Sequence, residues 1–161
     1  MTETEANLKH FLFPGGIHVS REACDISTVL GSCVAVTLWD YRLKYGGMNH
    51  FMLPLWNGEG LPTPKYGNIA MEKLLEKMLA IGCRKEQLVA KVFGGGNING
   101  TGREIFMIGD RNITLAFQML DDWRIHIEST DVGGIVGRKV IMNTATGIIH
   151  VAKGKKVQNG S

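Results

Sequence analysis

The stretch "TVLGSCVAVT" places a cysteine directly after a Gly-Ser pair and directly before a β-branched apolar run. Because Gly31 lets the backbone bend sharply, the N–H groups of Gly31, Ser32 and Cys33 can turn toward one point, as in an oxyanion hole. The thiol of Cys33 is therefore a candidate nucleophile. It also fits a small core residue, since free cysteine is among the most buried residue types.

A cysteine nucleophile needs a base, which is usually a histidine. Among five histidines, His50 is the one enclosed by glycine, methionine and phenylalanine, in "GGMNHFMLP". Residues 34–39 and 45–52 predict a hairpin through "DYRLK", whose simplest register pairs Cys33 with His50 at a Cβ separation of about 5 Å. The spacing therefore predicts a Cys–His dyad. Three nearby side chains could orient the imidazole: Ser27, Thr28 and Asn49.

The other two cysteines are predicted to be structural. Cys24 precedes Asp25, whose charge disfavours a thiolate, and Cys83 follows the predicted end of a helix, where the helix dipole raises a thiol pKa. Three cysteines without CxxC spacing indicate free thiols in a reducing compartment. No Cys/His cluster has the spacing of a zinc site, so neither a metal nor a cofactor is expected.

The composition is that of a globular protein, with 44% hydrophobic and 20% charged residues among 161. We expect one domain at residues 13–152, between a flexible leader at 1–12 and a flexible tail at 153–161. The net charge is +3 and its one local excess is "KGKK" near the C-terminus, which indicates a solvated tail and not a nucleic-acid surface. No apolar run approaches the roughly 18 residues of a membrane span, and the acidic N-terminus is unlike a signal peptide. A cytoplasmic protein without membrane insertion is expected.

Short β-branched runs between glycine clusters predict strands. These cover residues 16–20, 34–39, 45–52, 88–93, 124–129, 139–143 and 148–152. Residues 68–82 and 109–123 carry the period of amphipathic helices. Asn68 and Asp110 are the expected N-caps, and Gly82 ends the first helix. The pattern predicts an α+β fold with two main helices on mostly antiparallel or mixed β-sheet layers.

Two further motifs define no site by themselves. The loop "VFGGGNING" has neither GK[ST] nor GxGxxG, so a turn or a rim to the thiol pocket is favoured over a phosphate-binding loop. The motif "IGDRN" is typical of a helix N-terminus, and its Arg111 could contact a partner at the surface.

Five stretches in order resemble the CheD family of chemoreceptor glutamine deamidases: "LGSCVAV", "GGMNHFMLP", "AKVFGGGNI", "IGDRNI" and "GRKVIMNTATG". The resemblance runs from about Phe13 to Ala152. It implies a sheet-rich α/β sandwich similar to the catalytic fold of cytotoxic necrotizing factors. It also implies a cysteine hydrolase of bacterial chemotaxis, a protein-glutamine glutaminase that converts receptor glutamines to glutamate and, in some members, hydrolyses receptor methyl esters.

The family's Cys–His–Thr triad falls here on Cys33 and His50 for its first two members. The family's threonine lies six residues before the cysteine, where this sequence has Ser27, with Thr28 one place later. Serine keeps the hydroxyl, so Ser27 is the expected orienting residue and Thr28 the alternative. The expected mechanism begins with a Cys33 thiolate paired with the His50 imidazolium and passes through a thioester.

The resemblance implies two protein partners. The cytoplasmic domains of methyl-accepting chemoreceptors are the expected substrate, and CheC, a phosphatase of phosphorylated CheY, is the expected regulator. A rival interpretation is a non-catalytic binding partner of CheC. Two other enzyme classes use a Cys–His site: a cysteine peptidase, which needs an extended cleft for a main chain, and a transglutaminase, which incorporates an amine.

Overall fold

The β-branched runs form two sheets in the computed structural model, which describes residues 7–97 and 103–154. One sheet has the order β1-β3-β8-β9 and the other β2-β5-β4-β6-β7. The four-stranded sheet consists of β1 (Leu8–Phe11), β3 (Cys24–Leu30), β8 (Arg138–Asn143) and β9 (Ile149–Lys153). The five-stranded sheet consists of β2 (Ile17–Ser20), β5 (Tyr45–Asn49), β4 (Val34–Asp40), β6 (Leu88–Gly94) and β7 (His126–Val132).

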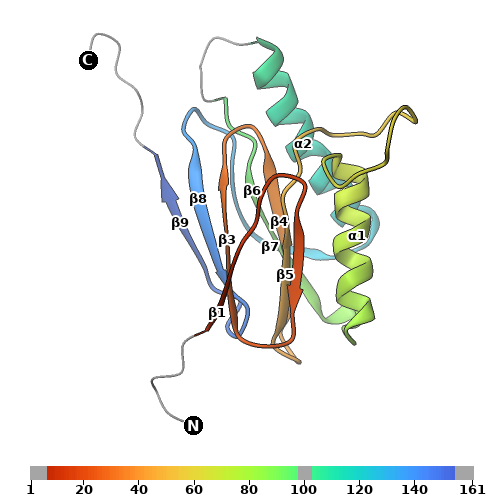
Figure 1. The fold of residues 1–161 in the computed structure, drawn as a ribbon, viewed down its shortest axis with the longest axis vertical. Coiled ribbons are helices and arrows are strands. Elements are labelled where there is room, and N and C mark those ends of the chain that lie inside the picture. Colours follow the sequence, from red (N-terminus) through yellow and green to blue (C-terminus); the bar gives the residue numbers. More distant parts are fainter. Residues whose placement is uncertain (1–6, 98–102, 155–161) are drawn as a thin grey trace.

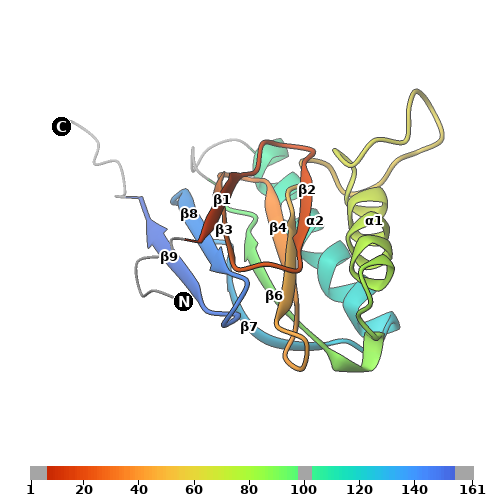
Figure 2. The same ribbon diagram turned by 60° about the horizontal axis from the view of Figure 1, so that its bottom comes forward.

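Two helices, α1 (Gly67–Ala80) and α2 (Arg103–Asp122), cover the five-stranded sheet on the face away from the four-stranded sheet (Figures 1 and 2). The result is three layers with two cores. Val36 and Leu38 of β4 pack toward the helices, while Ala35 packs toward the four-stranded sheet. Because β4 is covered on both faces, its apolar run is nearly continuous. The predicted α+β sandwich with two helices and mixed sheets is confirmed.

Two strands of the structure, β1 and β3, were missing from the sequence prediction. Residues 1–12 were expected to be a flexible leader, but within the described part of that segment β1 pairs in parallel with β3, and Leu12 is buried in the core. β3 contains Asp25, and aspartate is depleted in strands, which weakens the strand signal of its composition. Of the expected flexible tail, residues 155–161 lie outside the described residues.

The two expected helix N-caps were wrong. Tyr66 occupies the N-cap of α1, while the side chain of Asn68 accepts a hydrogen bond from the N–H of Trp56. α2 begins at Arg103, so Asp110 lies on an exposed turn inside the helix. Gly109 suggested a helix start, but a Cβ atom there would lie 2.7 Å from a backbone oxygen of the neighbouring loop. Gly109 therefore lets the backbone of this loop pack closely against the middle of the helix, and it does not mark the start of the helix.

The C-terminal end of α1 agrees with the sequence prediction, since Gly82 has φ +111° just after the helix. Gly147 has φ +75° in the turn between β8 and β9. In the part of the chain that the structure describes, no helix is both long enough and apolar enough to cross a membrane.

Candidate active site

Cys33 is half-buried in the turn between β3 and β4. This turn, the thiol loop, consists of Gly31, Ser32 and Cys33. Glycines after β6 pack on it. The N–H of Gly95 donates to the carbonyl of Cys33 at 2.8 Å, and the N–H of Gly96 donates to the carbonyl of Gly31 at 2.9 Å. Gly94, at φ +103°, is so close that a Cβ atom would collide with the Cys33 carbonyl. The glycine motif therefore holds the backbone of the thiol loop; its residues 98–100 lie outside the described residues.

The predicted β4–β5 hairpin exists, but its predicted register was wrong. Val34 is bridged to Phe51 and Thr37 to Met48, so Ala35, and not Cys33, is opposite His50 in this register. The turn is centred later than expected, because Asp40 accepts hydrogen bonds from the N–H groups of the four-residue loop that follows it. A shift of two residues keeps the facing of each side chain. His50 is thus a diagonal neighbour of the thiol loop instead of a direct one.

The imidazole of His50 is held by a hydroxyl that has one proton to donate. His50 is only 2% exposed, and its Nδ1 lies 2.7 Å from Oγ1 of Thr28. The same Oγ1 lies 2.7 Å from the carbonyl of Leu12, to which it donates. It must therefore accept from the Nδ1–H of the ring, which leaves Nε2 as the basic nitrogen. Nε2 is buried without a hydrogen-bond partner among the described residues.

The alternation of side chains along β3 decides which hydroxyl meets His50. Thr28 is fully buried on the face toward the second sheet, whereas Ser27 is partly exposed on the opposite face. The structure therefore brings Thr28 to the imidazole and does not bring Ser27 there. Asn49, the third candidate, uses its amide to bond the backbones of β4 and α1.

Burial shifts the pKa of both members of the pair toward their uncharged forms. It lowers the pKa of His50 to about 4 and raises the pKa of Cys33, an effect that the N–H of Cys33 partly offsets. Both directions favour the uncharged forms, a neutral thiol and a neutral imidazole at pH 7. The resting state that this burial favours differs from the expected thiolate–imidazolium pair.

The other two cysteines lie away from this chemistry. Cys24 and Cys83 are buried, and burial raises the pKa of each thiol. The negative charge of Asp25 adds to this effect at Cys24, as the sequence suggested. At Cys83 the added effect comes from Asp40. Over residues 7–97 and 103–154, no three His, Cys, Asp or Glu side chains are grouped to hold a metal ion.

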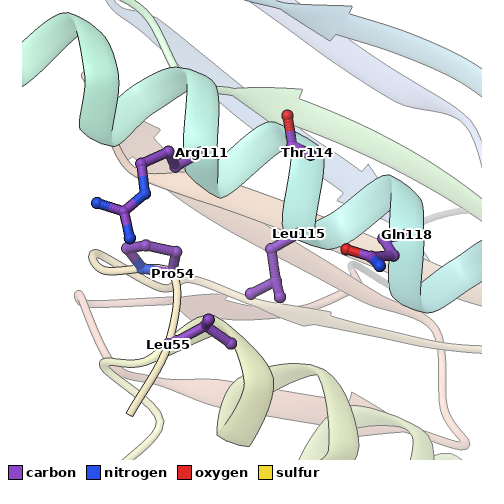
Figure 3. Close-up of a pocket in the computed structure, with 6 residues that line it drawn as sticks. All are labelled: Pro54, Leu55, Arg111, Thr114, Leu115 and Gln118. Carbon is purple, nitrogen blue, oxygen red and sulfur yellow. The ribbon is translucent and has the colours of Figure 1, made fainter. Parts of the chain in front are cut away.

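A small open pocket of about 210 Å³ lies between α2 and the segment that follows His50. Figure 3 shows Leu115 of α2 pointing toward Leu55, with the Arg111 side chain beside Pro54 at one end. Arg111 was expected at the surface, and it is exposed there as part of the pocket wall. Thr114 and Gln118 complete the lining.

A thiol loop, a buried imidazole and a hydroxyl meet where β1, β3, β4 and β5 have their adjoining ends, at the top of the sandwich in Figure 1. A thiol, an imidazole and an orienting hydroxyl are the side chains that cysteine hydrolases use, so the class to consider is that of the cysteine hydrolases. Residues 52–153 match the model of a family described as CheD chemotactic sensory transduction. The chain belongs to the CheD family, as its motifs predicted.

Several curated relatives match almost the whole chain. It is 65% identical over 148 residues to the probable chemoreceptor glutamine deamidase CheD of Trichlorobacter lovleyi, covering 92% of each chain. It is 41% identical over 151 residues to the protein of the same name from Sulfurimonas denitrificans, covering 93% of this chain and 97% of that one. It is 44% identical over 141 residues to the probable chemoreceptor glutamine deamidase CheD 1 of Anaeromyxobacter dehalogenans, covering 88% and 82%.

Proposed function

We propose that this protein is a chemoreceptor glutamine deamidase, which hydrolyses receptor glutamine side chains to glutamate and ammonia. The observation that carries the proposal is the chain of contacts from the Leu12 carbonyl through Thr28 to His50, because it leaves Nε2 basic near the thiol loop. The names of the relatives supply the substrate class.

In the proposed mechanism, Cys33 and His50 begin uncharged. Nε2 takes the proton of the thiol while Sγ bonds to the carboxamide carbon, so a charged pair forms only as the bond forms. The protonated ring then gives this proton to the departing nitrogen, which leaves as ammonia, and a thioester remains. Nε2 next takes a proton from water, and the hydroxide attacks the thioester carbon. The C–S bond breaks, glutamate is released, and the ring returns the proton to Sγ, which restores the thiol. Thr28 keeps the ring in the tautomer that both steps require.

The thiol loop is arranged to stabilise the oxyanion of this mechanism. The carbonyl of Gly31 is bonded to Gly96, and the N–H of Ser32 belongs to the same trans peptide, so it points the opposite way. The carbonyl of Ser32 is bonded on one side, so the N–H of Cys33 likewise points to the other. Neither N–H has a backbone acceptor among the described residues. Donors of this kind contribute roughly 3 kcal/mol each to transition-state binding.

The test is incubation with the cytoplasmic fragment of a methyl-accepting chemoreceptor. We expect ammonia release together with a mass gain of about one dalton per modified glutamine, located by peptide mass spectrometry. An added primary amine that became incorporated would identify a transglutaminase, and cleavage of the receptor chain would identify a peptidase. A receptor fragment that kept all its glutamines would contradict the proposal.

The same assay distinguishes the two candidate hydroxyls. Thr28→Val keeps the shape of the side chain but removes the acceptor of the Nδ1–H bond, so kcat should fall by about 10- to 100-fold. Ser27→Ala should stay within about twofold of the wild type, since Ser27 lies on the other face of β3. The reverse ranking of the two variants would assign the orienting role to Ser27.

The remaining parts of the proposal follow from the family resemblance. The reaction would take place in the cytoplasm, on the cytoplasmic domains of the receptors. Methyl esters of the same side chains would be a second substrate, because the thioester route also releases an alcohol. CheC would be the regulatory partner, and purified CheC should slow receptor deamidation when added in excess.

A further inference from the structure

The motif "IGDRN" supplies no group to the proposed proton transfers. It contains Asn112, a polar residue that is fully buried inside α2. Nδ2 of Asn112 donates to the carbonyl of Ser32 at 3.2 Å and to the carbonyl of Met52 at 3.0 Å. Ser32 precedes Cys33, and Met52 follows His50 by two positions. One amide group of α2 therefore joins the segment of the thiol to the segment of the imidazole.

The β4–β5 hairpin ends just before these two carbonyls. Val34 and Phe51 exchange both backbone hydrogen bonds, at 3.0 and 2.9 Å. In a continuing antiparallel ladder, the next hydrogen-bonded pair would be Ser32 and Leu53. The N–H of Leu53 bonds instead to a carbonyl outside the hairpin. The carbonyl of Ser32 has thus lost its ladder donor, and Asn112 supplies one from the helix layer.

Two features make Asn112 unfavourable at a buried position within a helix. Asparagine is a weak helix former, and Oδ1 of Asn112 is buried without a partner among the described residues. An unpaired buried acceptor destabilises the folded state, because it loses its hydrogen bonds to water and gains none in return. Both hydrogens of the amide are used, one on each carbonyl, and a hydrophobic side chain would provide neither.

We propose that Asn112 is a positioning residue, which fixes the thiol loop relative to the segment of His50. The close approach of Gly109 to Gly95 places α2 against the same glycines that hold the thiol loop, so the amide is itself rigidly placed. A displacement of about 1 Å between reacting groups can lower a rate by about 100-fold. The effect on turnover rests on the proposed function, whereas the effect on thiol reactivity does not.

The test is Asn112→Asp, which is isosteric but has at most one donor for the two carbonyls. In the receptor assay, kcat should fall about 30- to 100-fold with KM within about threefold. Alkylation of Cys33 by iodoacetamide, followed by mass spectrometry, should slow about tenfold at pH 7, because Nε2 no longer lies where it can accept the thiol proton. Both measurements are made at a temperature where circular dichroism shows the variant fully folded.

Asn68→Asp is the matched control. Asn68→Asp makes the same change from amide to carboxyl on α1. The new side chain keeps the oxygen that accepts the hydrogen bond from the N–H of Trp56. The kcat and alkylation rate of this variant should equal those of the wild type. If Asn112→Asp does not fold, Asn112→Ala replaces it, since a water in the vacated space can donate to both carbonyls. Losses of about fivefold are then expected.

The outcomes separate the inference from the proposed function. A purely structural role would lower the melting temperature but leave kcat and the alkylation rate of the folded variant unchanged, which would overturn the inference. If the wild type deamidates no receptor but the variant still slows Cys33 alkylation, the function fails and the positioning role stands. If the variant deamidates the receptor at the wild-type rate, the positioning role fails and the function stands.

Discussion

Cys33→Ala is expected to lower the rate of receptor deamidation by more than about 1,000-fold, because the proposed thioester forms on this sulfur and the other two thiols, Cys24 and Cys83, are buried. Removal of a half-buried sulfur at a turn should cost little stability, so the variant is expected to fold. The measurement is ammonia release from the receptor fragment, with the intact mass of the receptor as a second readout. The variant should also fail to form the acyl-enzyme that rapid acid quenching traps in the wild type.

The control is Cys24→Ala, which removes a thiol buried in the core at the other end of β3 from Thr28. The backbone N–H of Cys24, which donates to Oγ1 of Thr144, is kept in this variant. The variant should retain the wild-type kcat while losing some stability to the cavity that it leaves. Iodoacetamide offers a second comparison, since Cys33 should be alkylated first among the three cysteines. Full activity of Cys33→Ala would remove Cys33 from the mechanism.

His50→Gln is expected to lower kcat by a similar factor, since both proton transfers pass through Nε2. The wild type should also show an unusual pH profile. Burial lowers the pKa of His50 to about 4, and the base must be neutral, so kcat/KM should fall only as the pH approaches about 4. An exposed histidine would lose activity near pH 6.5. An acid limb near pH 6.5 in the wild type would contradict the buried, neutral base.

The same depressed pKa predicts how stability depends on pH. Between pH 6.5 and about 4 the unfolded chain binds a proton at this histidine and the folded chain does not, so the free energy of unfolding falls as the pH falls. The full loss from this group is about 3 kcal/mol. His50→Gln cannot titrate and should lack this part of the acid destabilisation. Urea unfolding at pH 7, 5.5 and 4.5 measures the difference, and parallel pH curves for the two proteins would contradict it.

The motifs themselves were sufficient to recognise the family. They also made Cys33 and His50 the candidates for the reacting pair. Each motif consists of residues that are close together in the sequence: a thiol directly after Gly-Ser, and a histidine among glycine, methionine and phenylalanine. A hairpin with a short turn connects the two motifs. The register was nevertheless wrong by two residues, because the hydrogen bonds of Asp40 set the turn and were not visible in the pattern of apolar residues.

The sequence of β3 could have indicated that Thr28, and not Ser27, faces His50. In "CDISTVL" every second residue, Cys24, Ile26, Thr28 and Leu30, is buried. Reading this segment as a strand would have placed Thr28 on the inner face and Ser27 on the outer one. The carbonyl of Leu12, which fixes the tautomer of His50 through Thr28, lies in a segment whose order depends on pairing with β3.

The sequence by itself determined the elements with strong periodicity, the α+β class, the family and the two residues proposed to react, since all of these depend on residue type and short spacing. Only the tertiary structure decided three other features: the contact of Thr28 with His50, the neutral state favoured for the pair, and the bridge made by Asn112. Each depends on contacts between residues distant in the chain, 22 positions apart for Thr28 and His50 and 80 for Asn112 and Ser32. Burial and pairing across such distances arise when the layers pack, and no local pattern encodes them.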